Sequence, residues 1–347
     1  MRMSERVGVL VLLPFVCACA VLAQSIELSR ASGSSSIQLD VVVTDKAGAP
    51  VSGLQPEDFT LLDNDVPQSI SSFEPVEASQ VKVILVLDAV NSDSRDVAIE
   101  RAEIKKFLKS KRGRLAVPTT FAVLTETGIK LHLGFSQDGE ALSSALGDYR
   151  VPRRSGGRAG VFKNSFDGFA QLVEEEREQP GRKLMIWISP GWPVVRGNLD
   201  AAQKEQIFGN VVEVSRELRE GRITLYNVDP SGTADIEVDM GMHLRPSNEK
   251  VQVAGASNPE AAGMSDLALG VLALQSGGLA LHPGNDLASD LQKCVADAEA
   301  YYEISFRPAI GNQPNEYHHL EIRVARLRLT PKEEAPAAKN RQGKGQR

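Results

Sequence analysis

The sequence has little of what nucleic-acid-binding and membrane proteins need. Only 5% of its 347 residues are aromatic, too few for the stacking platforms that hold single strands. The formal net charge is -6, and the sequence indicates no clustered basic surface outside its tail. Beyond the first two dozen residues, no apolar run approaches the roughly 18 residues that span a bilayer. We therefore expect no nucleic-acid partner and no membrane span in the mature chain.

Cysteine is scarce as well, with three residues, and two of them lie in a segment with the features of an export signal. A short head with two arginines precedes an apolar stretch that ends in small residues just before the polar Gln24. This order is typical of a secretory signal peptide, here residues 1–23. We expect a secreted or periplasmic protein. The alternatives are an uncleaved membrane anchor and a lipoprotein signal at Cys19.

The sequence also lacks the common catalytic motifs. It contains no Gly-x-Ser-x-Gly nucleophile elbow and no phosphate-binding loop that ends in Gly-Lys-Ser/Thr. After export only Cys294 would remain, and it recurs with Leu287 and Leu291 at helical spacing, which predicts a buried small hydrophobic residue. We expect no enzyme and no cofactor, and an envelope hydrolase is the third functional alternative.

Hydrophobic patterns divide the mature chain into two kinds of structure. After a Ser-rich linker over residues 24–36, residues 37–78 alternate apolar and polar side chains between turns, which predicts a small N-terminal β-unit. Residues 79–300 instead alternate continuous apolar strands, such as Val81–Leu87, with amphipathic helices. This alternation predicts an α/β fold with a doubly wound, mostly parallel sheet.

The strands at the two ends of the chain are expected to pair with each other. Residues 37–78 and the C-terminal strands within residues 301–330 are each too few to bury a core alone. Both flank one α/β unit, whose termini normally lie close together. We predict a small β-sandwich of about five strands; the alternative is that Tyr301–Phe306 extends the central sheet as an edge. The tail, residues 331–347, is expected to be disordered.

The segment Val83–Asp88, a buried strand that ends in aspartate before a helix, resembles the von Willebrand factor A domain. The flanks are similar to the acidobacterial family of A-domain-related secreted proteins. The residues that carry this narrower resemblance are Asp40–Asp45, Gly48–Val51, Leu54, Glu57–Phe59, Pro67–Ile70, Phe73, Leu225–Asp229, Gln275–Gly278 and Tyr301–Ile304. The resemblance covers roughly residues 37–326. It implies an A-domain, Rossmann-like fold and a role as a protein-interaction module.

A domains usually bind a divalent cation through an Asp-x-Ser-x-Ser loop, a Thr from a second loop and an Asp from a third. In the first loop Asp88 and Ser92 match this pattern, but Val90 replaces the middle hydroxyl, and the third loop has Pro190 where an acid would stand. Mg²⁺ needs near-octahedral oxygen ligands. We therefore expect no bound metal, with Asp88 and Ser92 as a degenerate remnant. The alternative is a metal-dependent (Mg, Mn or Ca) adhesion-type A domain that uses these two residues with unrecognised ligands.

The second loop suggests how a partner could be recognised without a metal. Arg153, Arg154 and Arg158 would repel a cation but can pair with carboxylates directly, although a solvated basic loop is the alternative. Trp192 follows Pro190-Gly191 and is expected at the rim of the same edge, where it could anchor a partner, unless its ring folds back over the sheet. These four residues are the candidate site for an unknown protein partner in the cell envelope or outside it.

Overall fold

The computed structural model describes residues 36–45, 50–77, 81–132, 134–150, 160–192, 199–230, 259–281, 286–308 and 320–325. The predicted signal peptide, the three arginines of the second loop and the tail lie outside these residues. Within the described part of the chain, no helix is both long and apolar enough to cross a membrane.

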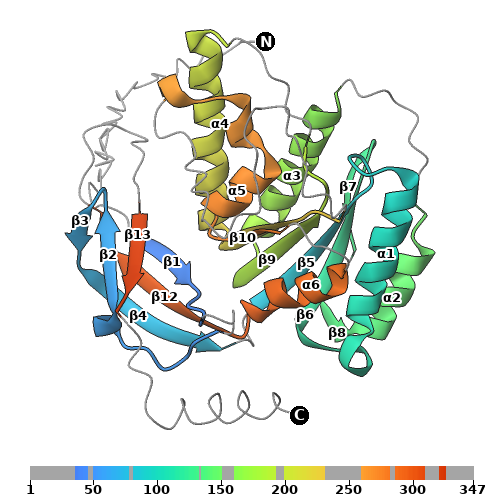
Figure 1. Ribbon diagram of the computed structural model, residues 1–347, viewed down its shortest axis with the longest axis horizontal. Coiled ribbons are helices and arrows are strands. Elements are labelled where there is room, and N and C mark those ends of the chain that lie inside the picture. Colours follow the sequence, from blue (N-terminus) through green and yellow to red (C-terminus); the bar gives the residue numbers. More distant parts are fainter. Residues whose placement is uncertain are drawn as a thin grey trace, which may run out of the picture. The chain divides into compact units, whose positions relative to one another are not determined.

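The central sheet has the strand order β11-β10-β9-β5-β6-β7, with β8 also paired to β6 (Figure 1). Its strands are β5 (Val81–Asp88), β6 (Arg114–Thr125), β7 (Gly128–Leu131), β8 (Ser136–Asp138), β9 (Arg182–Ile188), β10 (Ile223–Val228) and β11 (Ala280–Leu281). β5, β6, β9, β10 and β11 are parallel, whereas β7 and β8 run antiparallel to β6. β5, β9 and β10 are buried almost throughout, as expected for strands covered on both faces.

Helices cover both faces of the sheet, so the predicted doubly wound fold is confirmed. The α-helices are α1 (Ser94–Leu108), α2 (Gly139–Asp148), α3 (Val161–Arg177), α4 (Ala201–Glu220), α5 (Leu269–Gln275) and α6 (Leu287–Ala296). Short 3-10 turns are η1 (Pro56–Asp58), η3 (Ser110–Gly113), η4 (Pro259–Ala261) and η5 (Met264–Leu267). α1, α2 and α6 pack on one face, and α3, α4 and α5 on the other. Cys294 of α6 is fully buried, as predicted, and burial raises the pKa of its thiol.

Aspartate residues set where four of these helices begin. Asp93, Asp138, Asp200 and Asp286 are the N-caps of α1, α2, α4 and α6, and each side chain accepts a hydrogen bond from a backbone N–H of the first turn. Such a cap satisfies donors that have no partner inside the helix and contributes about 1 kcal/mol. Each of these helices therefore starts at a position fixed by its own sequence.

The strands from the two ends of the chain pair, which confirms the predicted β-sandwich. Its strands are β1 (Ile37–Val41), β2 (Phe59–Asp63), β3 (Val66–Gln68), β4 (Ile70–Glu77), β12 (Ala300–Phe306) and β13 (Leu320–Val324). β12 lies between β1 and β4, and β2 lies between β13 and β3, all antiparallel. β12 thus belongs to the sandwich and not to an edge of the central sheet. The described strands number six instead of about five, because Val66–Gln68 forms a strand of its own.

Aromatic side chains fill the space between the two small sheets. The ring centroids of Phe59, Phe73 and Tyr302 lie 5.2 to 5.3 Å from one another. The Tyr302 hydroxyl donates to the Val51 carbonyl at 2.9 Å and accepts from the Leu54 N–H at 3.1 Å. Tyr302 is therefore buried with its polar atom satisfied, and it ties the C-terminal strand β12 to the N-terminal segment.

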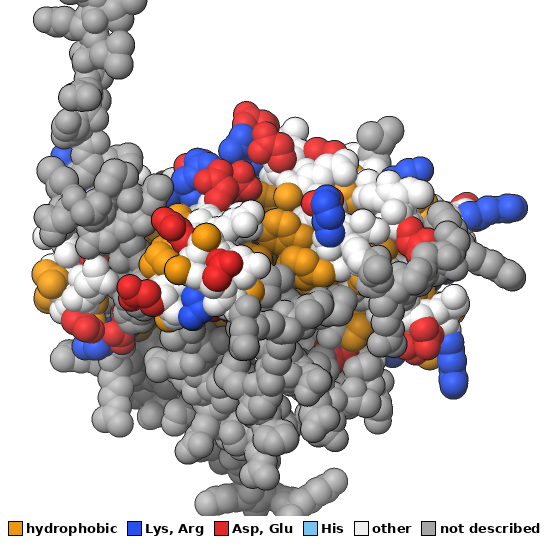
Figure 2. Space-filling model, turned by 90° about the horizontal axis from the view of Figure 1, so that it is seen from above, with side chains coloured by type: hydrophobic (Ala, Val, Ile, Leu, Met, Phe, Trp, Pro, Cys, Tyr) orange, Lys and Arg blue, Asp and Glu red, His pale blue; other side chains and the backbone are white. Residues whose placement is uncertain are grey.

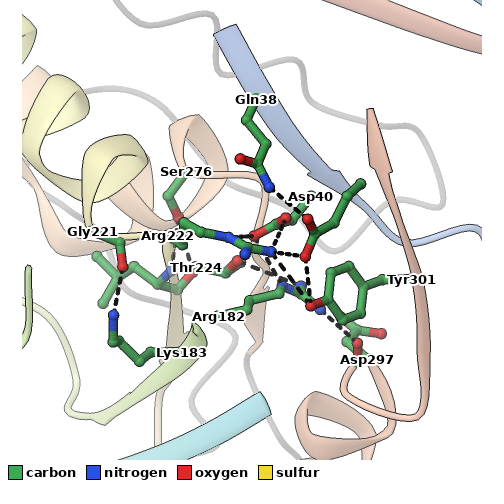
Figure 3. A network of polar contacts seen from close by, with 12 residues as sticks. Gln38, Asp40, Arg182, Lys183, Gly221, Arg222, Thr224, Ser276, Asp297 and Tyr301 are labelled. Atoms are coloured by element: carbon green, nitrogen blue, oxygen red, sulfur yellow. Dashed lines mark hydrogen bonds and ion pairs between the residues drawn. The ribbon is translucent and has the colours of Figure 1, made fainter. Parts of the chain in front are cut away.

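A polar network joins the sandwich to the central sheet (Figure 3). Arg222, directly before β10, donates to both carboxylate oxygens of Asp40 on β1, at 2.7 and 3.2 Å, and also to Glu303 on β12. The guanidinium of Arg182, the first residue of β9, lies 4.6 Å from the ring centroid of Tyr301. Arg182 and Arg222 stand at the amino ends of their strands. The sandwich is therefore attached at the edge opposite to the loops that follow the parallel strands.

Candidate functional site

The strand order places two loops at the point where the winding of the sheet reverses. From β5 the chain moves outward to β6 and β7, then returns to β9 on the other side of β5 and continues to β10 and β11. In open α/β sheets, ligands bind outside the carboxyl ends of the strands at such a point. Asp88 ends β5, and Ser189 follows β9. The structure therefore brings the predicted first and third loops to one place.

Asp88 is completely buried, and four N–H groups donate to its carboxylate. Oδ1 accepts from the backbone N–H groups of Val90 and Asn91, both at 3.0 Å. Oδ2 accepts from the side-chain amide of Asn91 at 2.7 Å and from the Trp187 indole N–H on β9 at 3.0 Å. The negative charge is thus held by donors from the loop itself and from the neighbouring strand.

Ser92 faces the interior of the fold. Its hydroxyl donates to Oε1 of Glu100 on α1 at 2.6 Å, and both residues are buried. Burial is the main reason that the pKa of Glu100 rises to about 8; the bond from Ser92 lowers it, and the nearby charge of Asp88 raises it. Glu100 is therefore mostly protonated at neutral pH. The Ser92 hydroxyl is engaged by its hydrogen bond to Glu100.

The third loop is also turned inward. Ser189 is fully buried, and its Oγ accepts from the Gly191 N–H at 3.1 Å. The carbonyl of Ser189 accepts from the side-chain amide of Asn227 on β10 at 3.0 Å. Asp229, which follows β10, is fully buried too, and its backbone N–H donates to the Leu281 carbonyl at 2.8 Å. These bonds connect the segments that follow β9 and β10 to the neighbouring strands. Pro190 stands in the loop after β9, at the position where the A-domain pattern has an acid.

The expected exposed position of Trp192 is wrong. The side chain is only 5% exposed, and its ring centroid lies 5.5 Å from those of Phe169 and Trp187. Phe166 contacts it edge-on at 6.3 Å. The physical reason is the apolar face that α3 and β9 present beside the loop, because a large ring gains more from burial there than from a place at the rim. Trp192 therefore packs against α3 and β9 beneath the loop that follows β9.

These residues do not fit a divalent cation. A metal ion needs the lone pairs of its carboxylate ligand, but N–H groups point at both oxygens of Asp88. The hydroxyl of Ser92 is turned to Glu100. Among the residues that the structure describes, no three His, Cys, Asp or Glu side chains are grouped so that they could hold a metal ion. The candidate arginines of the second loop lie outside the described residues.

Sequence reasoning missed three residues of this site: Asn91, Glu100 and Trp187. A signal for Glu100 was present, because it stands between Val97 and Ile104 on the inward stripe of α1, where a carboxyl group has to be buried. Asn91 adds a second contact, since its side-chain amide also donates to Ser165 Oγ on α3 at 2.9 Å. The bond from Trp187 depends on the register of β9 against β5, which the sequence does not contain.

Three features agree with the A-domain fold that the sequence resemblance implies. They are the winding of the sheet, the antiparallel strand β7 beside β6, and Asp88 at the end of β5. The fold is von Willebrand A-like. No family model and no curated protein matches the sequence. In the view of Figure 2, the described side chains include acidic and basic residues with apolar side chains between them.

Solved structures with some likeness include three proteins. Manganese-loaded Plasmodium vivax TRAP protein shares 12% identity over 46% of this chain and 60% of its own, with a TM-score of 0.26. Proximal thread matrix protein 1 of the mussel byssus shares 18% identity over 45% of this chain and 39% of its own, with a TM-score of 0.25. The SpRpn10 VWA domain shares 10% identity over 44% of this chain and 75% of its own, with a TM-score of 0.26. The chain thus spans less than two thirds of the length of the TRAP protein and of proximal thread matrix protein 1. At TM-scores this low, the fold assignment depends on the strand order alone.

Proposed function

We propose that this chain is a secreted or periplasmic protein-interaction module whose A-domain-like loop edge works without a metal and without catalysis. The observation that carries the proposal is the Asp88 carboxylate, which four N–H donors hold in the interior. In this arrangement the Asn91 amide and the Trp187 indole stabilise the buried charge that a cation would otherwise neutralise. The switch-point position of the loop supports a binding role.

Recognition of the partner falls to the second loop in this proposal. Arg153, Arg154 and Arg158 supply guanidinium groups that can pair bidentately with carboxylates, which a metal ion does in the adhesion-type alternative. Trp192 acts as packing beneath the edge, since it is buried against Phe166, Phe169 and Trp187. The partner is therefore a protein that presents acidic side chains.

Capture of envelope proteins on the immobilised mature chain should be insensitive to EDTA and reduced by the triple substitution Arg153→Gln, Arg154→Gln and Arg158→Gln. Three charge pairs with the partner at about 0.5 to 1 kcal/mol each correspond to a loss of capture of about tenfold to a hundredfold. Quantitative mass spectrometry of the eluates measures both effects. The matched control is Arg95→Gln with Lys130→Gln, which removes two exposed basic side chains of α1 and β7.

Two results would contradict this proposal in different ways. Loss of capture in EDTA, restored by Mg²⁺, would favour the metal-dependent adhesion domain that uses Asp88 and Ser92. Capture that is equal for the triple variant and the control, with both variants melting at the temperature of the wild type, would remove the arginines from the binding site.

Export is a separate part of the proposal. The charged head, apolar stretch and small residues before Gln24 support cleavage by a signal peptidase. Mass spectrometry of the protein purified from its own cells should find a chain that starts at or near Gln24. An intact N-terminus on a cytoplasmic pool would contradict export, and a lipid-modified Cys19 would show that the protein is anchored as a lipoprotein.

A further inference from the structure

The overall charge of -6 conceals a local excess of positive charge. Between Lys105 and Arg114 the chain carries six basic residues and no acidic one. This run covers the last turn of α1, the 3-10 turn η3 and the first residue of β6. The sequence does therefore contain a basic cluster outside its tail. It lies at the amino end of β6, the edge opposite to Asp88.

Part of this cluster is neutralised within the fold, and part is not. Lys106 pairs with Glu103 at 3.1 Å and with Asp286 at 3.2 Å, and Lys109 lies 3.5 Å from Glu140. In the described part of the chain, by contrast, Lys111, Arg112 and Arg114 make no ion pair, and all three are exposed. We call these three residues the basic turn.

The backbone of the basic turn adopts an unfavourable conformation. Lys111 has φ 49° and Arg112 has φ 62°, and Gly113 follows with φ 73°. A side chain in this left-handed region crowds the following carbonyl, so two consecutive non-glycine residues there are costly to the fold. Glycine or asparagine would relieve the crowding. The sequence has two long basic side chains at these positions instead.

A shallow hollow of about 70 Å³ lies beside the basic turn. Its apolar lining includes Phe107 from α1, Leu115 from β6 and Val295 from α6. Its polar lining includes Ser110, Lys111, Arg114 and Gln292. Glu299 is the acidic residue among the lining side chains. The pairing of β6 with β5 begins only at Thr119. Arg114 therefore lies in the part of β6 that extends beyond β5.

We propose that the basic turn and this hollow bind an extended acidic peptide segment of a partner protein. Carboxylates of the segment pair with the guanidinium groups of Arg112 and Arg114 and with Lys111, and an apolar side chain enters the hollow. A wide anionic surface such as a membrane fits less well, because Glu103, Glu140 and Asp286 lie against the neighbouring Lys106 and Lys109, and such a surface would be repelled by these carboxylates. A short segment contacts the turn without meeting them.

Fluorescence anisotropy with a labelled peptide of alternating Glu and Leu residues tests this proposal on the full chain. We expect saturable binding to the wild type and to the control variant Arg95→Gln with Lys130→Gln. Binding to Arg112→Gln with Arg114→Gln should be about tenfold weaker, as two lost charge pairs imply. The melting temperatures of both variants should match that of the wild type, since all four side chains are exposed.

Several results would overturn the proposal. Equal affinity of the wild type and the Arg112→Gln, Arg114→Gln variant is one of them, and equal binding of a peptide with Gln in place of Glu is another. Binding to vesicles that contain phosphatidylglycerol, in the absence of peptide binding, would assign the turn to a membrane surface instead. This proposal and the metal-free interaction module depend on different residues and are tested with different variants, so the failure of one would leave the other in place.

Discussion

A chain that ends at Ala300 should lose the β-sandwich and keep the α/β sheet. β12 is the middle strand between β1 and β4, and β13 pairs with β2, so the deletion removes a partner from every remaining strand but β3. It also removes Tyr302 and Ile304 from the sandwich core. Two or three strands without a packed face are not stable in water. Residues 37–77 should then become sensitive to protease at low concentrations that leave residues 81–300 intact.

Limited proteolysis followed by mass spectrometry of the fragments measures this difference. The matched control is a chain that ends at Thr330, which lacks only the tail and keeps β12 and β13. Its N-terminal strands should stay as protected as in the full chain. Protection of residues 37–77 in the chain that ends at Ala300 would show that these strands hold together without β12. Cleavage throughout residues 81–300 would show that the sheet itself depends on the segment after Ala300, whose Tyr301 packs in the core of the sheet.

The sequence predicted the large features of the fold because each has a periodic signal. Continuous apolar runs predicted the buried parallel strands, and helical spacing predicted the buried Cys294. The pairing of the two ends followed from a requirement, since neither end has enough strands to bury a core. These inferences need only the hydrophobic pattern and the number of elements.

The sequence failed where the outcome depends on contacts between distant elements. The inward position of Trp192 follows from the aromatic face formed by Phe166, Phe169 and Trp187, residues of α3 and β9. The replacement of two pattern ligands by Val90 and Pro190 is visible in the sequence. The four donors on Asp88 are not, because one of them comes from a neighbouring strand. The charge of a loop is visible in a sequence, and its partners are not.

Arg222 makes such contacts between distant elements, with Asp40 on β1 and Glu303 on β12. Arg222→Met should lower the free energy of unfolding by about 3 kcal/mol, because it takes the guanidinium away from the Glu303 carboxylate and leaves Asp40 only the longer ion pair with Arg182, at 3.9 Å. The side chains of Asp40 and Glu303 are only 10% and 18% exposed, so water replaces little of the lost interaction. Methionine keeps most of the length of the side chain, so the loss reflects the charge pair more than the packing.

A double-mutant cycle separates the pair from the rest of the network. Asp40→Asn in the Arg222→Met background should recover about 1 to 2 kcal/mol of the loss, because it removes one of the two stranded charges. Arg216→Met on α4 is the matched control, since its side chain is 39% exposed and pairs with Glu213 and Glu220 at the surface; it should cost less than about 1 kcal/mol. Urea unfolding followed by circular dichroism gives the free energy of unfolding of the four members of the cycle, which are the wild type, Arg222→Met, Asp40→Asn and the double variant, and of the control. If Arg222→Met cost no more than Arg216→Met, the ion pairs of Arg222 would contribute no more to the joint between sandwich and sheet than a pair at the surface does.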